Sequence, residues 1–277
     1  MARYAIKTPP HHITWTELLD LWRCADQLEV FESAWVWDHF YPLAEPWDGP
    51  NLEGWTILGA LAQATSRLRI GSMVNGMHHR HPAVTANMAA TLDHISGGRF
   101  ALGMGAGWNF MESDAYGIPL GTLRERSDRF EEGIEVIASM LSQKETTFTG
   151  TWFQLEKAWC EPRPVQEHIP IVVGGKGKRR TLRTAARFAD QWDMTFPTDP
   201  DDWLSHDAEL RRHCDDVGRD QSTITRSIHL AFASGDDPSA LRDHAAPFFE
   251  SGVDVVIWSA RDTVAPFAVE ALANALT

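Results

Sequence analysis

One stretch, residues 69–109, constrains the fold more than any other, because it reads as a strand, a helix and a second strand in close succession. We predict strands at residues 69–74 and 99–104. Residues 82–95 carry apolar side chains at helical spacing, and Gly97 and Gly98 are typical of a left-handed helix end. Such a unit predicts neighbouring parallel strands, whose carboxyl ends are followed by loops that bind ligands.

The rest of the chain continues this alternation of strands and helices. We count eight predicted strands alternating with eight predicted helices, without a linker or an internal repeat. Residues 146–155 alternate around Gly150 and read as a small hairpin, which we interpret as an insertion. The pattern predicts the α/β class and a (β/α)8 TIM barrel, in one domain spanning residues 1–277. A doubly wound open sheet is the alternative.

Composition narrows the class of partner. A formal net charge of −13 argues against a general nucleic-acid binder. No run of 18 apolar residues is present, so no membrane span is expected. The first residues lack the apolar segment of a signal peptide, and the three cysteines lie far apart, as is common in a reducing compartment. We therefore expect a cytoplasmic protein that acts on a small molecule.

Asp38 and His39 follow the second predicted strand, at the edge where ligands are expected. A histidine there can serve as an acid or a base near neutral pH, and a neighbouring carboxylate can orient it. Hydrogen bonding by His39 within its own loop is the alternative. The chain has no Gly-x-Ser-x-Gly motif and no His-Glu-x-x-His motif, which argues against a serine hydrolase and a zinc protease.

The histidine-rich run at residues 78–81 does not predict a metal site. Adjacent residues of an extended loop point in different directions, and no nearby Asp, Glu or Cys completes a ligand set. Arg80 within this run is expected to pair with an anionic ligand or a carboxylate. Glu112 and Asp114, beyond the next strand, are expected mainly at the surface. No metal is predicted.

Two glycine-rich loops follow predicted strands. Gly103, Gly105 and Gly107 do not fit a dinucleotide fingerprint, which requires Gly-x-Gly-x-x-Gly and an immediate helix. A loop that lets a flat ligand approach the backbone is the favoured interpretation, and a plain strand-end turn is the alternative. Gly174 and Gly175 precede a basic helix start, where free backbone N–H groups and the helix dipole favour a phosphate.

Several runs of residues, taken together and in order, resemble a known family. They include SAWVWDHFYP, RHPAVTANMAATLDHISGGRFALGMGAGW and PIVVGGKGKRRTLRTAARFADQWD, and the likeness extends from about Tyr4 to about Ser227. The chain is similar to the luciferase-like monooxygenase superfamily and, more narrowly, to its deazaflavin-dependent oxidoreductases, which use coenzyme F-420. The resemblance implies a (β/α)8 barrel that binds a flavin-like ring at the carboxyl ends of its strands.

The resemblance also assigns residues. It implies a non-prolyl cis peptide at Met73–Val74 as a support for the ring. The residues that it assigns to the ring are Ser72, Met73, Val74, Gly105, Ala106, Gly107 and Trp108. Those assigned to the phosphate are Gly174, Gly175 and Lys176. His39 is expected to exchange a substrate proton, oriented by Asp38, and substrate is expected to enter over His12, Phe40, Trp47 and Trp108.

The reaction implied is hydride transfer between coenzyme F-420 and a small organic substrate. Flavin mononucleotide (FMN) with oxygen, in a monooxygenase on the same scaffold, is the alternative. A cofactor carrier without catalysis and a sugar-phosphate isomerase are further hypotheses from other classes. The resemblance also favours a homodimer, for which the apolar helix at residues 52–64 offers a face.

Overall fold

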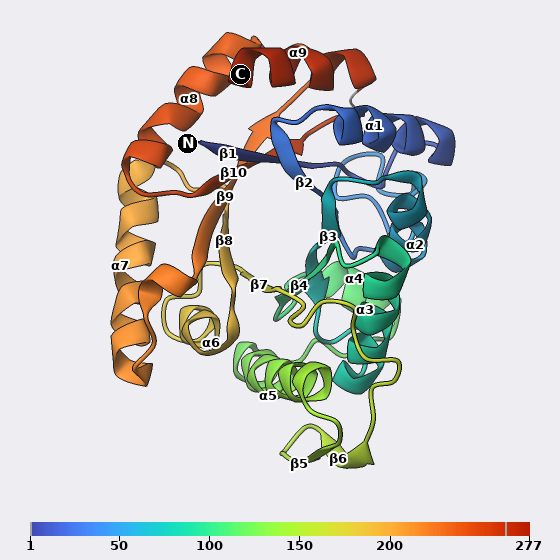
Figure 1. Ribbon diagram of the computed structural model, residues 1–277, viewed down its shortest axis with the longest axis vertical. Helices are drawn as coiled ribbons and strands as arrows, with labels where there is room; N and C mark the ends of the chain where they lie inside the picture. Colours follow the sequence, from blue (N-terminus) through green and yellow to red (C-terminus); the bar gives the residue numbers. More distant parts are fainter. Residues whose placement is uncertain (1, 264) are drawn as a thin grey trace.

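The computed structural model describes residues 2–263 and 265–277. Eight parallel strands close into a barrel in the order β1-β10-β9-β8-β7-β4-β3-β2, with the helices outside them (Figure 1). The barrel strands are β1 (Arg3–Lys7), β2 (Phe31–Val36), β3 (Arg69–Gly76), β4 (Phe100–Gly105), β7 (Ile171–Gly174), β8 (Gln191–Thr195), β9 (Thr225–Phe232) and β10 (Val255–Ala260). The predicted TIM barrel is thereby confirmed, and the open sheet is excluded.

The helices follow the predicted alternation, with one addition. They are α1 (Trp15–Gln27), α2 (Gly54–Ala64), α3 (Pro82–Ser96), α4 (Phe110–Ala115), α5 (Leu123–Ser142), α6 (Thr181–Phe188), α7 (Pro200–Val217), α8 (Pro238–Glu250) and α9 (Pro266–Leu276). A short 3-10 helix, η1 (Gln221–Thr223), precedes β9. The predicted hairpin forms a separate antiparallel pair, β5 (Thr146–Thr149) and β6 (Gln154–Ala158), below α5 in Figure 1. Helix α4 was not predicted.

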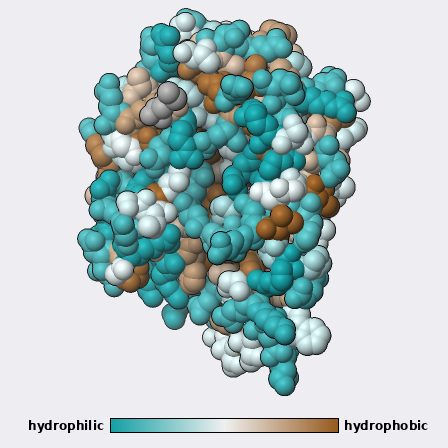
Figure 2. All heavy atoms as spheres, in the orientation of Figure 1, coloured by the Kyte–Doolittle hydropathy of each residue, from teal (hydrophilic) through white to brown (hydrophobic). Residues whose placement is uncertain are grey.

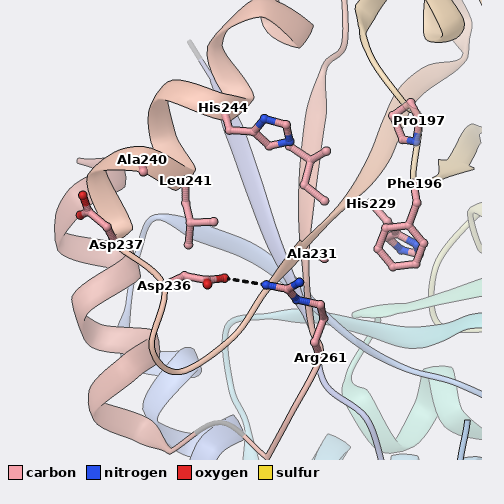
Figure 3. Close-up of a pocket in the computed structure, with 11 residues that line it drawn as sticks. Phe196, Pro197, His229, Ala231, Asp236, Asp237, Ala240, Leu241, His244 and Arg261 are labelled. Atoms are coloured by element: carbon pink, nitrogen blue, oxygen red, sulfur yellow. Dashed lines mark hydrogen bonds and ion pairs between the residues drawn. The ribbon is translucent and has the colours of Figure 1, made fainter. Parts of the chain in front are cut away.

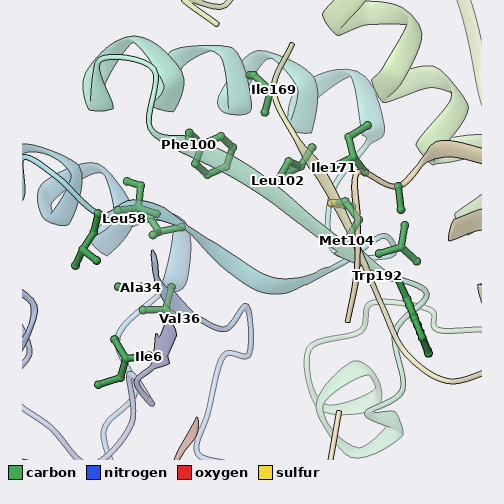
Figure 4. Close-up of a cluster of buried hydrophobic side chains, with 14 of the residues drawn as sticks. Ile6, Ala34, Val36, Leu58, Phe100, Leu102, Met104, Ile169, Ile171 and Trp192 are labelled. Atoms are coloured by element: carbon green, nitrogen blue, oxygen red, sulfur yellow. The ribbon is translucent and has the colours of Figure 1, made fainter. Parts of the chain in front are cut away.

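Strand residues alternate between two apolar layers, as the pleat of a strand requires. Ala34 and Val36 of β2 point outward and pack between the strands and the helices, in the cluster shown in Figure 4. Trp35, between them, belongs to a smaller cluster that also holds Met73 and Val172. This smaller cluster fills the barrel interior, so the open space lies above it, at the carboxyl ends of the strands.

The local signals that end the elements are also as predicted. Gly97 closes α3 in the left-handed conformation, with φ of 65°. The pairing of β3 with β4 shifts between Ser72 and Asn75, and the Met73–Val74 peptide there is cis, as the family resemblance implied. The barrel thus presents the backbone of residues 73–76 at its carboxyl edge, next to the end of β4.

The molecular surface is mostly hydrophilic on the face that Figure 2 shows, with hydrophobic residues scattered over it. Isolated apolar residues of this kind are normal on a folded protein. Within residues 2–263 and 265–277, no helix has both the length and the apolar character needed to cross a membrane.

Candidate active site

A cavity of about 700 Å³ opens at the carboxyl ends of the barrel strands. Its lining comes from several strands and from the loops that follow them, including Lys7 of β1, the β2 loop at Asp38 and His39, and Asp193 of β8. The volume lies within the usual range for small-molecule sites. The cavity therefore brings together residues that are far apart in the sequence at the edge where a TIM barrel binds its ligands.

His39 in this cavity is held by Glu112 of α4. Its Nδ1 lies 2.7 Å from Glu112 Oε2, and the backbone N–H of Phe40 donates to the other carboxylate oxygen. Because an ionised carboxylate only accepts hydrogen bonds, Nδ1 carries a proton and donates it. In the neutral ring, Nε2 is then the bare nitrogen, which is able to accept a proton from a ligand.

The charge of Glu112 is set by opposing effects. Burial raises the pKa of this carboxyl, which is only 1% exposed, but the hydrogen bonds from His39 and the Phe40 N–H outweigh burial and lower the pKa overall. Glu112 is therefore an anion at neutral pH, and it holds the His39 ring by direct contact. The expectation that Glu112 lies mainly at the surface is wrong.

Asp38 has different partners from its neighbour. Its carboxylate accepts two hydrogen bonds from Arg80 Nη1, at 2.9 and 2.8 Å, and lies 3.1 Å from His79 Nδ1. Arg80 also donates to Glu53. The prediction that Asp38 orients His39 is therefore wrong, because adjacent residues at a strand end point in different directions. The expectation that Arg80 pairs with a carboxylate is confirmed.

Most of the residues assigned to the ring line this cavity. They are Met73, Val74, Gly105, Ala106, Gly107 and Trp108. Ser72 is fully buried and lies outside the lining, and its hydroxyl has no hydrogen-bond partner among the described residues. Trp108 is 61% exposed and packs edge-on against His39, with ring centroids 5.4 Å apart. The glycine-rich loop after β4 and the end of β3 thus form adjoining walls.

The glycines of these walls have a structural explanation that sequence reasoning missed. A Cβ at Gly105 or Gly174 would come within 2.8 or 2.7 Å of the Val74 side chain. Val74 therefore occupies the space next to Gly105, where a flat ligand is expected, and next to Gly174, where a phosphate is expected. Gly107 has φ of +86°, and a Cβ there would meet the His78 ring, so both conformation and space require glycine.

Residues from the starts of α5 and α6 also line the cavity. Gly174, Gly175 and Thr181 line the cavity, and no side chain caps the N-terminus of α6. Arg126 of α5 lines the same region, and its Nε and Nη1 are buried without a partner among the described residues. Lys176, which we had assigned to the phosphate, is exposed and lies outside the lining. Arg126, unlike Lys176, lines the cavity.

Three of the four predicted entry residues lie outside the cavity lining. His12 bonds to the carbonyl of Ala44, with 3.1 Å between Nε2 and the oxygen. Phe40 packs against the rings of His79 and Tyr116. Trp47 lies on a separate surface depression together with Glu45, Pro46 and Asp48. Of the four residues predicted to contact entering substrate, only Trp108 lines the cavity itself.

The floor of the cavity carries buried titratable groups that sequence reasoning did not single out. Lys7, Asp193 and His229 come from β1, β8 and β9 and are 8%, 1% and 1% exposed. Asp193 accepts a hydrogen bond of 2.9 Å from the Ser227 hydroxyl. His229 lies beside Phe196 at one side of the cavity, where a second pocket of about 420 Å³ extends toward α8 (Figure 3). The ion pair of Arg261 with Asp236 borders this second pocket.

For two of the residues that the sequence analysis did not place in the cavity, Glu112 and Arg126, the sequence contains a local helix-start signal. Asn109 caps α4 by accepting from the Glu112 N–H at 3.2 Å, and an Asn three positions before a Glu is a recognisable helix start. Arg126 follows the capping box of Thr122 and Glu125. Lys7, a single charged residue at the end of a short strand, had no such signal. Within the described parts of the chain, no group of three or more His, Cys, Asp or Glu is placed to hold a metal.

Comparison with known proteins assigns the family. The family model for luciferase-like monooxygenases matches residues 2–275, nearly the whole chain. The chain belongs to this family. The resemblance seen in the sequence is thereby confirmed.

Individual relatives cover less of their own length. An uncharacterised protein of Mycobacterium tuberculosis is 37% identical over 151 residues, which is 54% of this chain and 52% of that protein. The F420-dependent glucose-6-phosphate dehydrogenase of Microbacterium testaceum is 31% identical over 201 residues, covering 72% of this chain and 58% of the dehydrogenase. The chain thus matches little more than half the length of these curated relatives.

A solved structure has the same fold over the whole chain. The coenzyme F420-dependent tetrahydromethanopterin reductase of Methanopyrus kandleri superimposes with a TM-score of 0.85, covering 99% of this chain and 98% of the reductase. The sequence identity is 19%, so this likeness concerns the barrel and its connections.

Proposed function

We propose that this protein is an oxidoreductase that binds coenzyme F-420 and transfers a hydride to or from a small organic substrate. The observation that carries the proposal is His39, which is held by the buried Glu112 through one ring nitrogen and lines the cavity. A histidine fixed in this way is suited to take or give the proton that accompanies hydride transfer. The F420-dependent dehydrogenase among the relatives supports the choice of cofactor.

The residues of the cavity fit such a cofactor. The end of β3 and the loop after β4 offer backbone groups to a flat ring, and the α6 start with Arg126 offers donors to a phosphate. Arg126 has two buried nitrogens without partners, so an anion there satisfies groups that are otherwise costly to bury. We assign the phosphate to Gly174, Gly175 and Arg126, with Lys176 at the outer edge.

When bound, the deazaflavin supplies the hydride or accepts it. His39 removes the hydroxyl proton of an alcohol, or returns it to a carbonyl, through Nε2. Glu112 holds the ring in the tautomer that this step requires and stabilises its charged form. Trp108 and Trp37 border His39 and limit the access of water to it.

FMN with oxygen remains the second candidate, because the family model describes monooxygenases. A deazaflavin reacts poorly with oxygen, whereas a reduced flavin reacts readily, so the two cofactors imply different chemistry on one scaffold. Both carry a phosphate and a flat ring, and the same walls fit both.

The deciding experiment titrates the protein separately with coenzyme F-420 and with FMN and follows cofactor fluorescence. We expect the deazaflavin to bind at least tenfold more tightly, and Arg126→Met to weaken both cofactors while Lys144→Met, at an exposed site, changes neither. Tight binding of FMN with weak binding of the deazaflavin overturns the proposal. A panel of secondary alcohols and ketones then identifies a substrate by the change in deazaflavin absorbance.

We also propose that the protein is a homodimer. An apolar groove lies between α2 and α3, lined by Trp55, Val84, Met88 and Ile95, and Val84 is 51% exposed. Val84 and Met88 are one turn apart, so a second copy of the groove can cover both. Light scattering of the purified protein tests this: we expect the mass of two chains for the wild type and of one chain for Val84→Glu.

A further inference from the structure

The floor of the cavity presents two polar side chains, Lys7 and Ser259, that make no side-chain hydrogen bond to another described residue. Lys7 of β1 and Ser259 of β10 occupy paired register positions, so both side chains point to the same face of the sheet. Both line the cavity, and both are buried by their surroundings, with Lys7 8% and Ser259 5% exposed. Lys7 Nζ makes no hydrogen bond to another described residue, and it lies over the Trp37 ring, 5.5 Å from the ring centroid.

A buried ammonium without an acceptor is costly, because it has lost its water and gained nothing in exchange. Burial accordingly lowers the pKa of Lys7 to about 8, against the opposing attraction of Asp193. An oxygen atom from a ligand, accepting from Lys7 Nζ and from the Ser259 hydroxyl, removes this cost. Binding of a ligand oxygen atom at the floor is therefore favoured.

The charge balance selects the kind of oxygen. Asp193 supplies the negative charge that faces Lys7, and its Oδ2 lies 3.6 Å from His229 Nδ1 without a donor between them. Burial lowers the pKa of His229 well below its usual value, so the ring is neutral, and its Nε2 lies 3.1 Å from Met73 Sδ. Above about pH 7, where Asp193 is ionised, its carboxylate balances the Lys7 ammonium, so a second anion is disfavoured, whereas a carbonyl or hydroxyl oxygen leaves the balance unchanged.

The subsite lies close to the proposed proton-exchanging residue. The Trp37 ring separates them, at 5.5 Å from Lys7 Nζ and with its centroid 6.5 Å from that of His39. His39 lies four positions beyond Trp35, which is the register partner of Lys7, so Lys7 is the deeper of the two. A small molecule that lies along Trp37 can therefore reach both residues with different atoms.

We propose that Lys7 and Ser259 form a subsite for an uncharged carbonyl or hydroxyl oxygen of the substrate, separate from the oxygen whose proton His39 exchanges. The inference rests on the proposed function for its second oxygen at His39, but the subsite itself is defined without the cofactor. It assigns the substrate to neutral compounds with two oxygen functions, and it makes Lys7 a residue that determines specificity.

The test follows Lys7 directly by NMR. The chain has five lysines, so protein labelled with ¹³C at lysine Cε gives few signals, and Lys7→Met assigns the one of interest. Three probes of nearly equal shape are added to the cofactor-free protein: acetophenone with a neutral carbonyl, benzoate with a carboxylate, and α-methylstyrene with no oxygen. We expect acetophenone to shift the Lys7 signal, benzoate to bind at least fivefold more weakly, and α-methylstyrene to leave it unchanged.

Variants separate the subsite from a loss of folding. Lys7→Met is expected to lower acetophenone affinity about tenfold, and so is Lys7→Met combined with Asp193→Asn, which removes both charges and keeps the floor neutral. Lys144→Met, at an exposed lysine, is the matched control and is expected to bind like the wild type. Equal binding of acetophenone by Lys7→Met, a larger Lys7 shift with benzoate, or no shift with acetophenone at its solubility limit overturns the proposal.

The same proteins distinguish this proposal from the proposed function. Deazaflavin affinity is measured for each variant by fluorescence, and Lys7→Met is expected to change it less than twofold. If the wild type fails to bind the deazaflavin while acetophenone still shifts Lys7, the cofactor assignment falls and the subsite stands. If the deazaflavin binds and the Lys7 signal does not respond to acetophenone, the reverse holds.

Discussion

Two parts of the cavity differ in how their buried polar groups are paired. We call the part that holds Asp38, His39 and Glu112 the upper wall, and the part that holds Lys7, Asp193 and His229 the floor. On the upper wall, His39 and Glu112 satisfy each other, and Asp38 is satisfied by Arg80 and His79. On the floor, Lys7 has no acceptor, and Asp193 Oδ2 and His229 Nδ1 have no partner among the described residues. The carboxylates of the upper wall thus have side-chain partners, although His78 Nδ1 and His79 Nε2 have none among the described residues, while the charged groups of the floor leave a polar surface for a ligand to complete.

This difference indicates that proton exchange and substrate selectivity belong to different parts of the cavity. A group whose partner is another side chain has a defined orientation and charge, which suits it to proton exchange or to holding the fold. A buried polar group without a partner destabilises the folded protein, so binding of a ligand that supplies the missing partner is favoured there. Substitutions in the upper wall, in the floor and outside both are therefore expected to have effects of different kind and size.

Removal of the proton-exchanging group should have the largest effect. His39→Ala is expected to lower kcat about 10³-fold, roughly 4 kcal/mol, because general acid–base catalysis contributes about 10²–10⁴-fold. The measurement is deazaflavin turnover with the best alcohol or ketone of the substrate panel, with cofactor affinity measured in parallel. An unchanged kcat contradicts the assignment and favours a cofactor carrier.

Loss of the Asp38 carboxylate should act on stability. Asp38→Asn is expected to lower the free energy of unfolding by about 3 kcal/mol, because it leaves the Arg80 guanidinium without its buried partner. Urea denaturation gives the value. Glu32→Gln, which breaks the exposed Arg3–Glu32 pair, is the control and should cost less than about 1 kcal/mol. Equal effects of the two variants show that Asp38 is not a structural anchor.

Asp193 of the floor should make the free energy of unfolding depend on pH. Burial raises the pKa of Asp193 to about 7, against the Ser227 hydrogen bond and the charge of Lys7. A raised carboxyl pKa means that the folded state holds a proton that the unfolded state releases near pH 4. The free energy of unfolding should therefore fall as pH rises from 4 to 7, by about 2 kcal/mol more in the wild type than in Asp193→Asn. Parallel curves for the two proteins contradict this.

A smaller effect is expected from the partner of His39. Glu112→Gln keeps a hydrogen-bond acceptor but removes the negative charge beside His39. We expect kcat, measured as deazaflavin turnover, to fall about tenfold, because the ring loses the carboxylate that fixes its orientation for proton exchange. An unchanged kcat contradicts a role of the Glu112 charge in the reaction.

The smallest effect concerns a residue that the fold leaves out of the cavity. Trp47 lies on its own depression, apart from both the upper wall and the floor. Trp47→Ala should change kcat and KM less than about twofold, within the range of ordinary surface substitutions. A larger change in KM restores the original expectation that substrate passes over Trp47.

Sequence reasoning reached the barrel because its signals are local. The strand–helix–strand unit, the Gly97 cap and the hairpin around Gly150 each depend on residues within a few positions of one another. Helix α4 escaped because it has only six residues, too few for a helical period to show, and two of them, Phe110 and Met111, are exposed apolar side chains. Because α4 was not predicted, the position of Glu112 beside His39 was not predicted either.

By itself, the sequence determined the order of strands and helices, the family, and the loops that carry the cavity walls, because periodicity, helix caps and family motifs are all written along the chain. The tertiary structure alone decided the partners. It gave Glu112 to His39 and Arg80 to Asp38, placed Arg126 where Lys176 was expected, and brought Lys7, Asp193 and Ser259 together from three strands. Closing a barrel brings residues from distant parts of the chain to one edge, and no local pattern records which of them then meet.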